Sequence, residues 1–148
     1  MLHWFGIEGD FYVMVLELLG PNLYDLFKFC GKKFTIKTTT MLAIEMIHAL
    51  EIFHKHYFIH RDIKPENFMI GRETNSSKIY LIDFGLAKRY VDTKTGNHIK
   101  NKTKDQFSIG TANYMSRNAT LKNESSRRDD LESVSLILLH FAKGKLPW

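Results

Sequence analysis

The 148-residue sequence is poor in cysteine and contains no long apolar run. A single cysteine, Cys30, excludes an internal disulfide, and a lone thiol of this kind is typical of a reducing compartment, where we expect it to be buried. No apolar stretch reaches the length of a membrane-spanning helix. Residues 1–9 carry no basic stretch followed by an apolar run, so no secretory leader is expected. These absences predict an intracellular protein, in the cytoplasm, the nucleus or both, that does not act in a membrane.

The basic residues are concentrated in the second half of the chain. Residues 1–60 hold 5 Lys against 6 Asp and Glu, whereas residues 61–148 hold 16 Lys and Arg against 10 Asp and Glu. Such a surface fits a nucleic acid, a membrane surface, an acidic protein or plain solvation. Aromatic residues do not alternate with the basic ones as stacking platforms for bases would, which disfavours a nucleic-acid partner.

Apolar periodicity predicts two long helices that carry most of the core. One covers residues 38–56, and the other begins near Asp129 and ends at Gly144 and Pro147. Their predicted inner faces consist of apolar side chains at helical spacing, namely Leu42, Met46, Ala49, Leu50 and Phe53 in the first helix and Leu131, Val134, Leu138 and Phe141 in the second.

Short elements surround these helices. Asn22 is a candidate cap for a short helix that buries Leu23, Leu26 and Phe27. Residues 88–120 are polar, basic and irregular, and too long for a simple connection. Short strands are predicted at 11–17, 58–59, 68–70 and 79–82.

Three motifs lie on the predicted loops in a fixed order. They are His60-Arg61-Asp62-Ile63-Lys64-Pro65-Glu66-Asn67, Asp83-Phe84-Gly85 and Gly110-Thr111-Ala112-Asn113-Tyr114. Each is weak by itself, but in this order and context they resemble the signature of protein kinases. Phosphoryl transfer needs positioning and neutralisation of charge more than covalent help, and loop carboxylate, amide and lysine groups supply both.

The residue types predict a role for each position. Asp62 is placed to orient the substrate hydroxyl or to accept its proton, and Lys64 to neutralise the moving phosphoryl group. Asn67 and Asp83 offer hard oxygen ligands that suit Mg²⁺. In the resemblance to kinases, Lys64 together with Thr111 favours serine or threonine as the acceptor.

Two residues of the first motif have other expected roles. His60 is expected to be structural, packed and hydrogen-bonded in the core. Arg61 is expected to pair with a phosphorylated activation segment or with a local carboxylate. For Asp62 the structural alternative is an aspartate that caps the loop.

The segments around these motifs resemble the casein kinase 1 family over essentially the whole chain. The similarity is carried by Glu-Leu-Leu-Gly-Pro-Asn-Leu at 17–23, Ile-Asp-Phe-Gly-Leu-Ala-Lys-Arg-Tyr at 82–90, Ser-Arg-Asn at 116–118, where most kinases have Ala-Pro-Glu, Ser-Arg-Arg-Asp-Asp-Leu-Glu-Ser at 126–133 and Gly-Lys-Leu-Pro-Trp at 144–148.

The resemblance implies an ATP site and a brace for the catalytic loop. Leu16 would be the gatekeeper beside the adenine. Asp130 would be the buried carboxylate that braces the loop at 60–62, a role that is compatible with capping the helix. The remaining ATP-site positions that the resemblance implies are the hinge residues Glu17, Leu18 and Leu19, together with Glu66, Met69 and Ile82.

The sequence also departs from the family. Asn113 stands where the family has an arginine that helps to bind an anion. The sequence therefore lacks a positive charge that, in the family, helps to recognise phosphate-primed substrates. Met115 replaces a commoner alanine, and Ser135 a glycine. No Gly-x-Gly-x-x-Gly loop occurs in the sequence. We expect that loop, with its phosphate-binding lysine and glutamate, to precede residue 1, and the last large-lobe helices to follow Trp148, which would leave apolar surface exposed.

The predicted fold is therefore α+β and protein-kinase-like, incomplete at both ends. Residues 1–16 would end the small lobe with its last strand, 17–22 would form the hinge, and 23–148 a mostly α-helical large lobe. We expect Asp62 and Asp83 to face one another across a cleft beside the hinge.

The functional hypothesis is a casein kinase 1-like protein serine/threonine kinase. It would use ATP and Mg²⁺ on protein substrates, including acidic ones, and the 148-residue chain alone is expected to be weakly active or inactive. The alternative is a catalytically dead remnant that serves as a binding or regulatory fragment. The sequence leaves the oligomeric state open.

Overall fold

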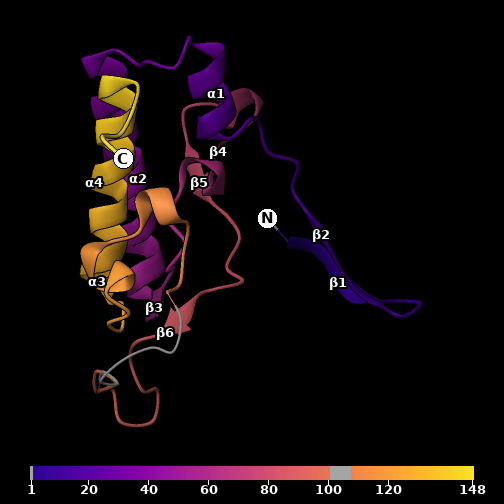
Figure 1. Ribbon diagram of the computed structural model, residues 1–148. Helices are drawn as coiled ribbons and strands as arrows, with labels where there is room; N and C mark the ends of the chain where they lie inside the picture. The colour runs from indigo at the N-terminus through magenta and orange to yellow at the C-terminus, as the bar shows by residue number, and fades with distance from the viewer. Residues whose placement is uncertain (1, 101–107) are drawn as a thin grey trace.

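The protein consists of a helical body and a β-hairpin that stands apart from it in the view of Figure 1. The computed structural model describes residues 2–100 and 108–148. In chain order the elements are β1 (Leu2–Glu8), β2 (Phe11–Leu16), α1 (Leu23–Phe29), α2 (Ile36–Lys55), β3 (Phe58–Ile59), η1 (Pro65–Asn67), β4 (Phe68–Ile70), η2 (Glu73–Asn75), β5 (Ile79–Leu81), β6 (Lys88–Arg89), η3 (Ala112–Tyr114), α3 (Arg117–Thr120) and α4 (Arg127–Lys143), where η marks a 3₁₀ turn.

The helices α2 and α4 pack against each other and form the centre of the body. Met46 and Leu50 of α2 and Ile137 and Phe141 of α4 are fully buried between them and their neighbours. Thr35 caps α2 by accepting a hydrogen bond from the Thr38 backbone N–H, at 3.1 Å. The predicted first helix is thus confirmed, with its start at Ile36 because Thr35 provides the cap.

The helix α4 also confirms its prediction, with differences at one end and on one face. It begins at Arg127 rather than Asp129, because Asp129 closes a capping box with Ser126. It ends at Gly144, whose φ of 84° is the left-handed conformation that glycine tolerates best. Val134 and Phe141 are buried as predicted, but Leu131 is 45% exposed, so its assignment to the inner face is wrong.

The helix α1 confirms the predicted cap at Asn22, whose side chain accepts a hydrogen bond from the Asp25 backbone N–H at 2.9 Å. Leu23 and Phe27 are buried in the core. Cys30 follows α1 and is exposed, which corrects the expectation of a buried thiol. Cys30 is the C-cap of α1 and so lies at the helix terminus, outside the helix face that buries Leu23 and Phe27.

The hairpin contains one strand that the sequence analysis predicted and one that it did not. The strand β2 confirms the prediction, and β1 pairs with it antiparallel, from Leu2 opposite Leu16 to Glu8 opposite Phe11. Gly9 makes the turn with a φ of 59°. Side chains of both faces are exposed, including Phe5, Ile7, Phe11, Tyr12 and Met14.

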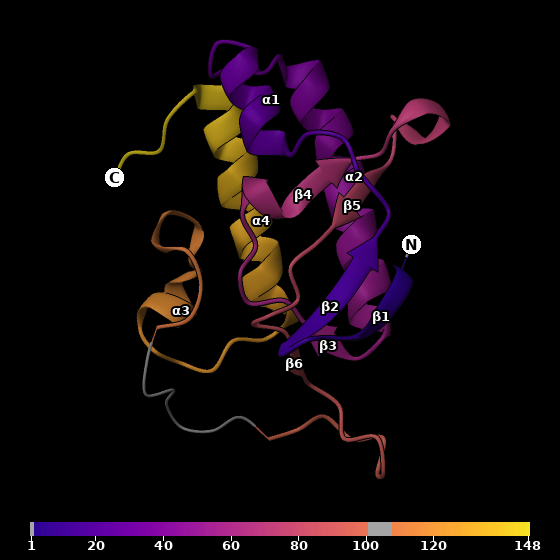
Figure 2. The ribbon, with the colours of Figure 1, turned by 90° about the vertical axis from the view of Figure 1, so that its right-hand side faces the viewer.

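Short antiparallel strand pairs carry the loops of interest. The pair β3–β6 places Phe58 opposite Arg89, and the pair β4–β5 places Met69 opposite Tyr80. Figure 2 shows β4 and β5 beside the upper half of α2, with β3 and β6 near its lower end. The predicted irregular stretch 88–120 holds only short elements where it is described, and its residues 101–107 lie outside the described residues.

Candidate active site

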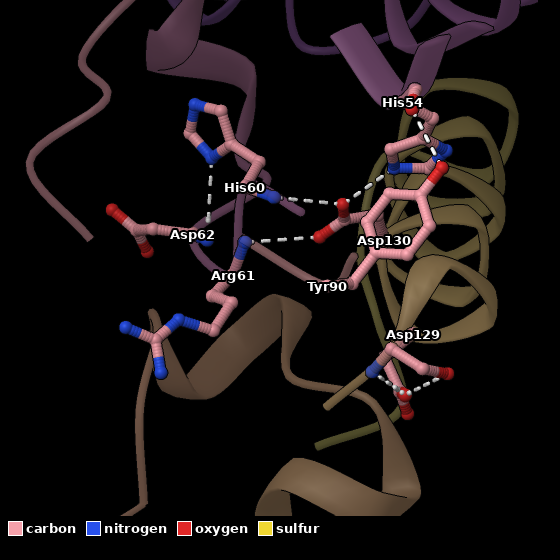
Figure 3. Close-up of polar contacts among 8 residues, drawn as sticks. His54, His60, Arg61, Asp62, Tyr90, Asp129 and Asp130 are labelled. Carbon is pink, nitrogen blue, oxygen red and sulfur yellow. Dashed lines mark hydrogen bonds and ion pairs between the residues drawn. The ribbon is translucent and has the colours of Figure 1, made fainter. Parts of the chain in front are cut away.

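A buried carboxylate on α4 holds the loop that follows β3 (Figure 3). Asp130, 2% exposed, accepts hydrogen bonds from the backbone N–H groups of His60 at 2.9 Å and of Arg61 at 3.0 Å. Arg61 has a φ of 69°, a left-handed conformation that is unfavourable for a non-glycine residue. The two charge-assisted hydrogen bonds compensate for that strain and fix the direction in which Asp62 leaves the loop.

Two residues that the sequence analysis missed complete this brace. His54, near the end of α2, places Nε2 at 2.8 Å from a carboxylate oxygen of Asp130. The Tyr90 hydroxyl donates to the backbone carbonyl of His54 at 2.7 Å. Figure 3 shows both rings beside Asp130, on the side away from Asp62. No signal in the sequence marks His54, because its spacing is that of an ordinary residue at the end of a helix.

His60 is structural, as predicted. Its side chain is fully buried, its Nε2 lies 3.0 Å from the carbonyl oxygen of Ile82, and its Nδ1 accepts the Asp62 backbone N–H at 3.3 Å. These partners assign the proton to Nε2 and leave Nδ1 as the acceptor. The ring therefore ties the Asp62 loop to the end of β5.

Both carboxylate oxygens of Asp62 have partners. Lys64 Nζ donates to Oδ2 at 2.7 Å, and the Thr111 hydroxyl donates to Oδ1 at 2.7 Å from a position 49 residues away. Burial alone would raise the pKa of Asp62, but the hydrogen bonds from Lys64 and Thr111 outweigh it and hold the pKa below its ordinary value. Asp62 is therefore ionised at neutral pH, and each of its carboxylate oxygens is held by one hydrogen bond, from Lys64 or from Thr111.

The contacts of Asn67 bring the two predicted metal ligands, Asn67 and Asp83, close to the Asp62 loop. The side-chain Nδ2 of Asn67 donates to the Asp62 backbone carbonyl at 2.9 Å, and the backbone carbonyl of Asn67 accepts the Ile82 N–H at 2.9 Å. Asp83 directly follows Ile82, so it begins beside Asn67. Asp83 has a φ of 61°, and the Gly85 N–H donates to its Oδ1 at 3.3 Å.

The charge on Lys64 reflects this cluster. The hydrogen bond to Asp62 raises the pKa of Lys64, and the negative charges of Glu66 and Asp83 raise it further. Lys64 is therefore cationic at neutral pH, paired with Asp62 and under the electrostatic influence of Asp83. No separation between the Asp62 and Asp83 carboxylates follows from these contacts, and their facing across a cleft stays a prediction.

The donor set fits a magnesium ion that is shared with a phosphate. Because Asn67 uses Nδ2 for the Asp62 carbonyl, its Oδ1 remains for a cation, and Asp83 adds an exposed carboxylate. Residues 2–100 and 108–148 contain no group of three or more His, Cys, Asp or Glu side chains that could hold a metal alone. Mg²⁺ is usually bound through one or two protein oxygen ligands together with substrate phosphates, which is the arrangement that these two residues offer.

The predicted hinge is tied to β4. The Gly20 N–H donates to the Ile70 carbonyl at 2.8 Å, and the Ile70 N–H donates to the Pro21 carbonyl at 3.1 Å. These bonds put the segment 17–22 beside Met69, which forms a bridge with Asn22.

The other positions assigned to the nucleotide differ in exposure. Leu16 and Leu18 are exposed, whereas Glu17, Leu19, Met69 and Ile82 are half-buried. Glu66, also half-buried, has one buried carboxylate oxygen without a hydrogen-bond partner among the described residues.

The Gly-Thr-Ala loop packs directly on the catalytic loop. Gly110 has a φ of 110°, and a Cβ added to it would lie 2.7 Å from the Arg61 carbonyl oxygen. Only glycine fits this approach, and it brings Thr111 within reach of Asp62. Arg61 donates from Nε to the Leu86 backbone carbonyl at 2.7 Å. The partner of this hydrogen bond is therefore a carbonyl oxygen and not the local carboxylate that was one of the two predicted partners.

Asp129 anchors the segment that follows the Gly-Thr-Ala loop. Its Oδ1 accepts hydrogen bonds from Ser116 Oγ at 2.7 Å and from Asn118 Nδ2 at 3.1 Å, and its Oδ2 accepts the Ser126 N–H at 2.7 Å. Burial would raise the pKa of Asp129, but these hydrogen bonds outweigh it and keep the pKa low. The Ser-Arg-Asn segment at 116–118 is thereby fixed to the start of α4.

A loop aspartate braced from a central helix, next to paired metal-ligand candidates and a threonine loop, is the arrangement of a phosphotransferase site. A family model described as the protein kinase domain matches residues 2–148, and the chain belongs to this family. Protein kinases phosphorylate protein substrates and typically use ATP and Mg²⁺. In the described part of the chain, none of the helices is both long and apolar enough to cross a bilayer.

Proposed function

We propose that the chain forms part of a casein kinase 1-like protein serine/threonine kinase. In this proposal residues 1–16 end the small lobe, 17–22 form the hinge and 23–148 belong to the large lobe. The observation that carries the proposal is the position of Asp62, which is held by Lys64 on one oxygen and by Thr111 on the other. Contacts of this kind suit a group that must orient a hydroxyl while it stays ionised.

The site residues have separate roles in this mechanism. Asp62 accepts the hydrogen bond of the substrate hydroxyl and orients its oxygen toward the phosphoryl group. Lys64 offsets the negative charge that develops there, and Thr111 keeps the Asp62 carboxylate from rotating. Asn67 and Asp83 would hold Mg²⁺, which supplies charge neutralisation on the phosphates when it is bound.

The nucleotide would lie against the hinge. Leu16 would lie beside the base, and the backbone groups of Glu17, Leu18 and Leu19 would contact it. Hydrogen bonds between the hinge and β4 support this assignment, because they fix the hinge beside Met69. Glu66, Met69 and Ile82 would line the rest of the nucleotide site.

Serine or threonine as the acceptor is proposed from the residue types at two positions. Lys64 two residues after Asp62 and Thr111 after Gly110 are the pattern of serine/threonine kinases. Both side chains hydrogen-bond Asp62, so the two positions that carry the pattern lie at the proposed acceptor site.

A catalytically inactive remnant is the second candidate. It is favoured by one observation: both faces of the hairpin expose large apolar side chains, which suits a fragment that binds another protein. Such a protein would keep the brace around Asp62 and yet fail to hold a triphosphate in line with an acceptor.

One experiment separates the two candidates. The chain is assayed alone and joined behind the small lobe of a casein kinase 1 family member, with radiolabelled ATP, Mg²⁺ and casein, followed by phosphoamino-acid analysis. We expect the joined protein to label serine and threonine, and Asp62→Asn to lower the rate by roughly a hundredfold or more, because the variant keeps the shape and loses the charge. Asp25→Asn, an exposed carboxylate on α1, is the control that should leave the rate unchanged.

The chain alone is expected to transfer little or no label. Positioning of reacting groups can supply roughly 7–11 kcal/mol of the barrier, and an ATP molecule without a cover over its phosphates loses much of it. A joined protein that binds ATP and yet gives no Asp62-dependent transfer would support the remnant, and label on tyrosine would refute the serine/threonine assignment.

A further inference from the structure

An ion pair with a buried carboxylate joins two segments on either side of the proposed site. Lys88 Nζ donates to Glu124 Oε1, from a position 36 residues away in the chain. The Glu124 side chain is 7% exposed and that of Lys88 is 30% exposed. The proposed mechanism assigns no role to either residue. We call this ion pair the α3 clamp, because Glu124 lies in the turn that follows α3.

The Lys88 side of the α3 clamp is attached to the catalytic loop. Lys88 in β6 lies opposite Ile59 in β3, and β3 leads directly into the loop that carries Asp62. The Arg61 side chain binds the carbonyl of Leu86, two residues before Lys88. Lys88 is therefore held on a strand pair whose position is coupled to that of the Asp62 loop.

The Glu124 side belongs to a compact unit, residues 116–124, that contains α3. The Asn123 N–H donates to the Asn118 carbonyl at 2.9 Å, and the Lys122 N–H donates to the Ala119 carbonyl at 3.1 Å. Lys122 has a φ of 58°, a left-handed conformation that is unfavourable for a non-glycine residue. This turn leads the chain to Glu124, which is buried. The unit is thus linked by its own hydrogen bonds and should behave as one body.

This unit needs two attachments to keep a single orientation. Asp129 holds its start through the side chains of Ser116 and Asn118, and the α3 clamp holds its end. Figures 1 and 2 show α3 and β6 at the same end of the body. One residue, Met115, separates the unit from η3, which Thr111 precedes. A rotation of the unit about its start would therefore be passed on to Thr111.

An ion pair suits this role better than an apolar contact does. The cost of removing two charges from water offsets much of their attraction, so a buried pair is often no more stabilising than apolar side chains of the same volume. It does impose a distance and a direction, because the ammonium group must meet a carboxylate oxygen. Orientation and stability can therefore be separated by experiment at this pair.

We propose that Lys88 and Glu124 are positioning residues that keep Thr111 aligned with Asp62. The proposal rests on the proposed function, in which Asp62 orients the substrate hydroxyl. With the α3 clamp closed, the Thr111 hydroxyl stays on Asp62 Oδ1, at 2.7 Å. With the clamp broken, the unit turns, this hydrogen bond forms only part of the time and the carboxylate is less well oriented. Both residues act through Thr111 and take no part in the transfer itself.

The first test measures hydrogen–deuterium exchange in the chain itself. The double variant Lys88→Met/Glu124→Met replaces the α3 clamp by apolar side chains of similar volume. We expect its urea midpoint to stay close to that of the unchanged chain, and exchange in residues 116–126 to be at least roughly threefold faster. Glu51→Met/Lys55→Met, which removes an exposed ion pair on α2, is the matched control and should leave exchange in residues 116–126 unchanged.

The second test measures casein phosphorylation by the chain joined to a small lobe. The double methionine variant should lower kcat at least roughly fivefold and leave the KM for ATP unchanged, because a misplaced group costs rate without altering the hinge. Lys88→Glu/Glu124→Lys restores an ion pair with the charges exchanged and should recover most of kcat. A purely structural role would leave kcat per folded molecule unchanged in both variants.

Three results would overturn the proposal. Unchanged exchange in residues 116–126 of the double methionine variant would mean that the α3 clamp does not hold this unit. Faster exchange with an unchanged kcat would limit the pair to a structural role. No recovery of kcat by the charge-exchanged variant would remove the role of the pairing. An inactive joined parent would refute the proposed function and the positioning role with it, whereas the exchange data would still decide whether the clamp holds α3.

Discussion

The carboxylate of Asp130 accepts the backbone N–H of Arg61 at 3.0 Å and so holds a residue whose φ is 69°. The two residues are 69 positions apart in the chain. Because Arg61 precedes Asp62, the strained backbone sets the direction of the aspartate that we propose to be catalytic. The brace thus links the packing of α4 to the chemistry of the loop.

Asp130→Asn tests the brace. An amide keeps one oxygen acceptor but turns its NH₂ toward a backbone N–H, so one buried donor loses its partner. We expect the free energy of unfolding to fall by about 2–4 kcal/mol, measured by urea denaturation. The exposed Asp25→Asn should leave the midpoint nearly unchanged, and an equal midpoint for Asp130→Asn would show that the brace contributes nothing.

Thr111→Ala tests the second contact of Asp62. Removing a hydrogen bond to a charged group costs about 1.5–3 kcal/mol, or roughly a 10- to 100-fold fall in kcat if it acts in the transition state. Thr111→Ser keeps the hydroxyl and should retain most of the rate. The measurement is casein phosphorylation by the chain joined to a small lobe. A Ser variant as slow as the Ala variant would contradict a role for the hydroxyl itself.

Gly110→Ala tests the close approach of the two loops. The added methyl group would lie 2.7 Å from the Arg61 carbonyl oxygen, in addition to the strain of a φ of 110°. We expect a loss of about 1–3 kcal/mol in unfolding free energy. Gly31 also has a positive φ, 70°, but no atom lies within 4 Å of an added Cβ. Gly31→Ala therefore measures only the cost of placing alanine in a left-handed backbone conformation. Equal losses in both variants would mean that the contact with Arg61 is unimportant.

The pair of His140 and Tyr114 predicts a dependence of stability on pH. Their side chains lie 2.8 Å apart, between His140 Nδ1 and the Tyr114 hydroxyl. Burial lowers the pKa of His140 below its ordinary value of 6.5, so the unfolded chain binds the proton first as the pH falls. Stability from this group is complete above pH 6.5 and decreases as the pH drops toward the folded-state pKa.

His140→Asn removes the titration and retains an acceptor near the position of Nδ1. We expect the difference in unfolding free energy between the unchanged chain and this variant to shrink from about pH 7.5 to about pH 5.5, measured by urea denaturation at each pH. Thr40→Ala, an exposed position on α2 that carries no titratable group, is the control and should give a constant difference. A constant difference for His140→Asn as well would refute the assignment.

The sequence by itself determined the local elements, and it predicted the chemical roles that the proposed function uses. Helical spacing in Met46 and Leu50 and in Val134 and Phe141 specified two buried faces, and Asn22 and Gly144 specified where helices begin and end. These features depend on neighbours within one turn of the chain, which is why a single sequence reveals them. The order of the three motifs likewise identified the residues on which the proposed mechanism rests.

Only the tertiary structure decided which residues meet and which stay exposed. Periodicity places Leu131 on an apolar face but carries no information on whether another element covers it, and the same holds for Cys30 after α1. The contacts of Asp130 with His54 and Arg61, and of Thr111 with Asp62, join residues that are 49 to 76 positions apart. Such contacts depend on how α4 packs on α2, and that packing minimises exposed apolar area over the whole body rather than within any one segment.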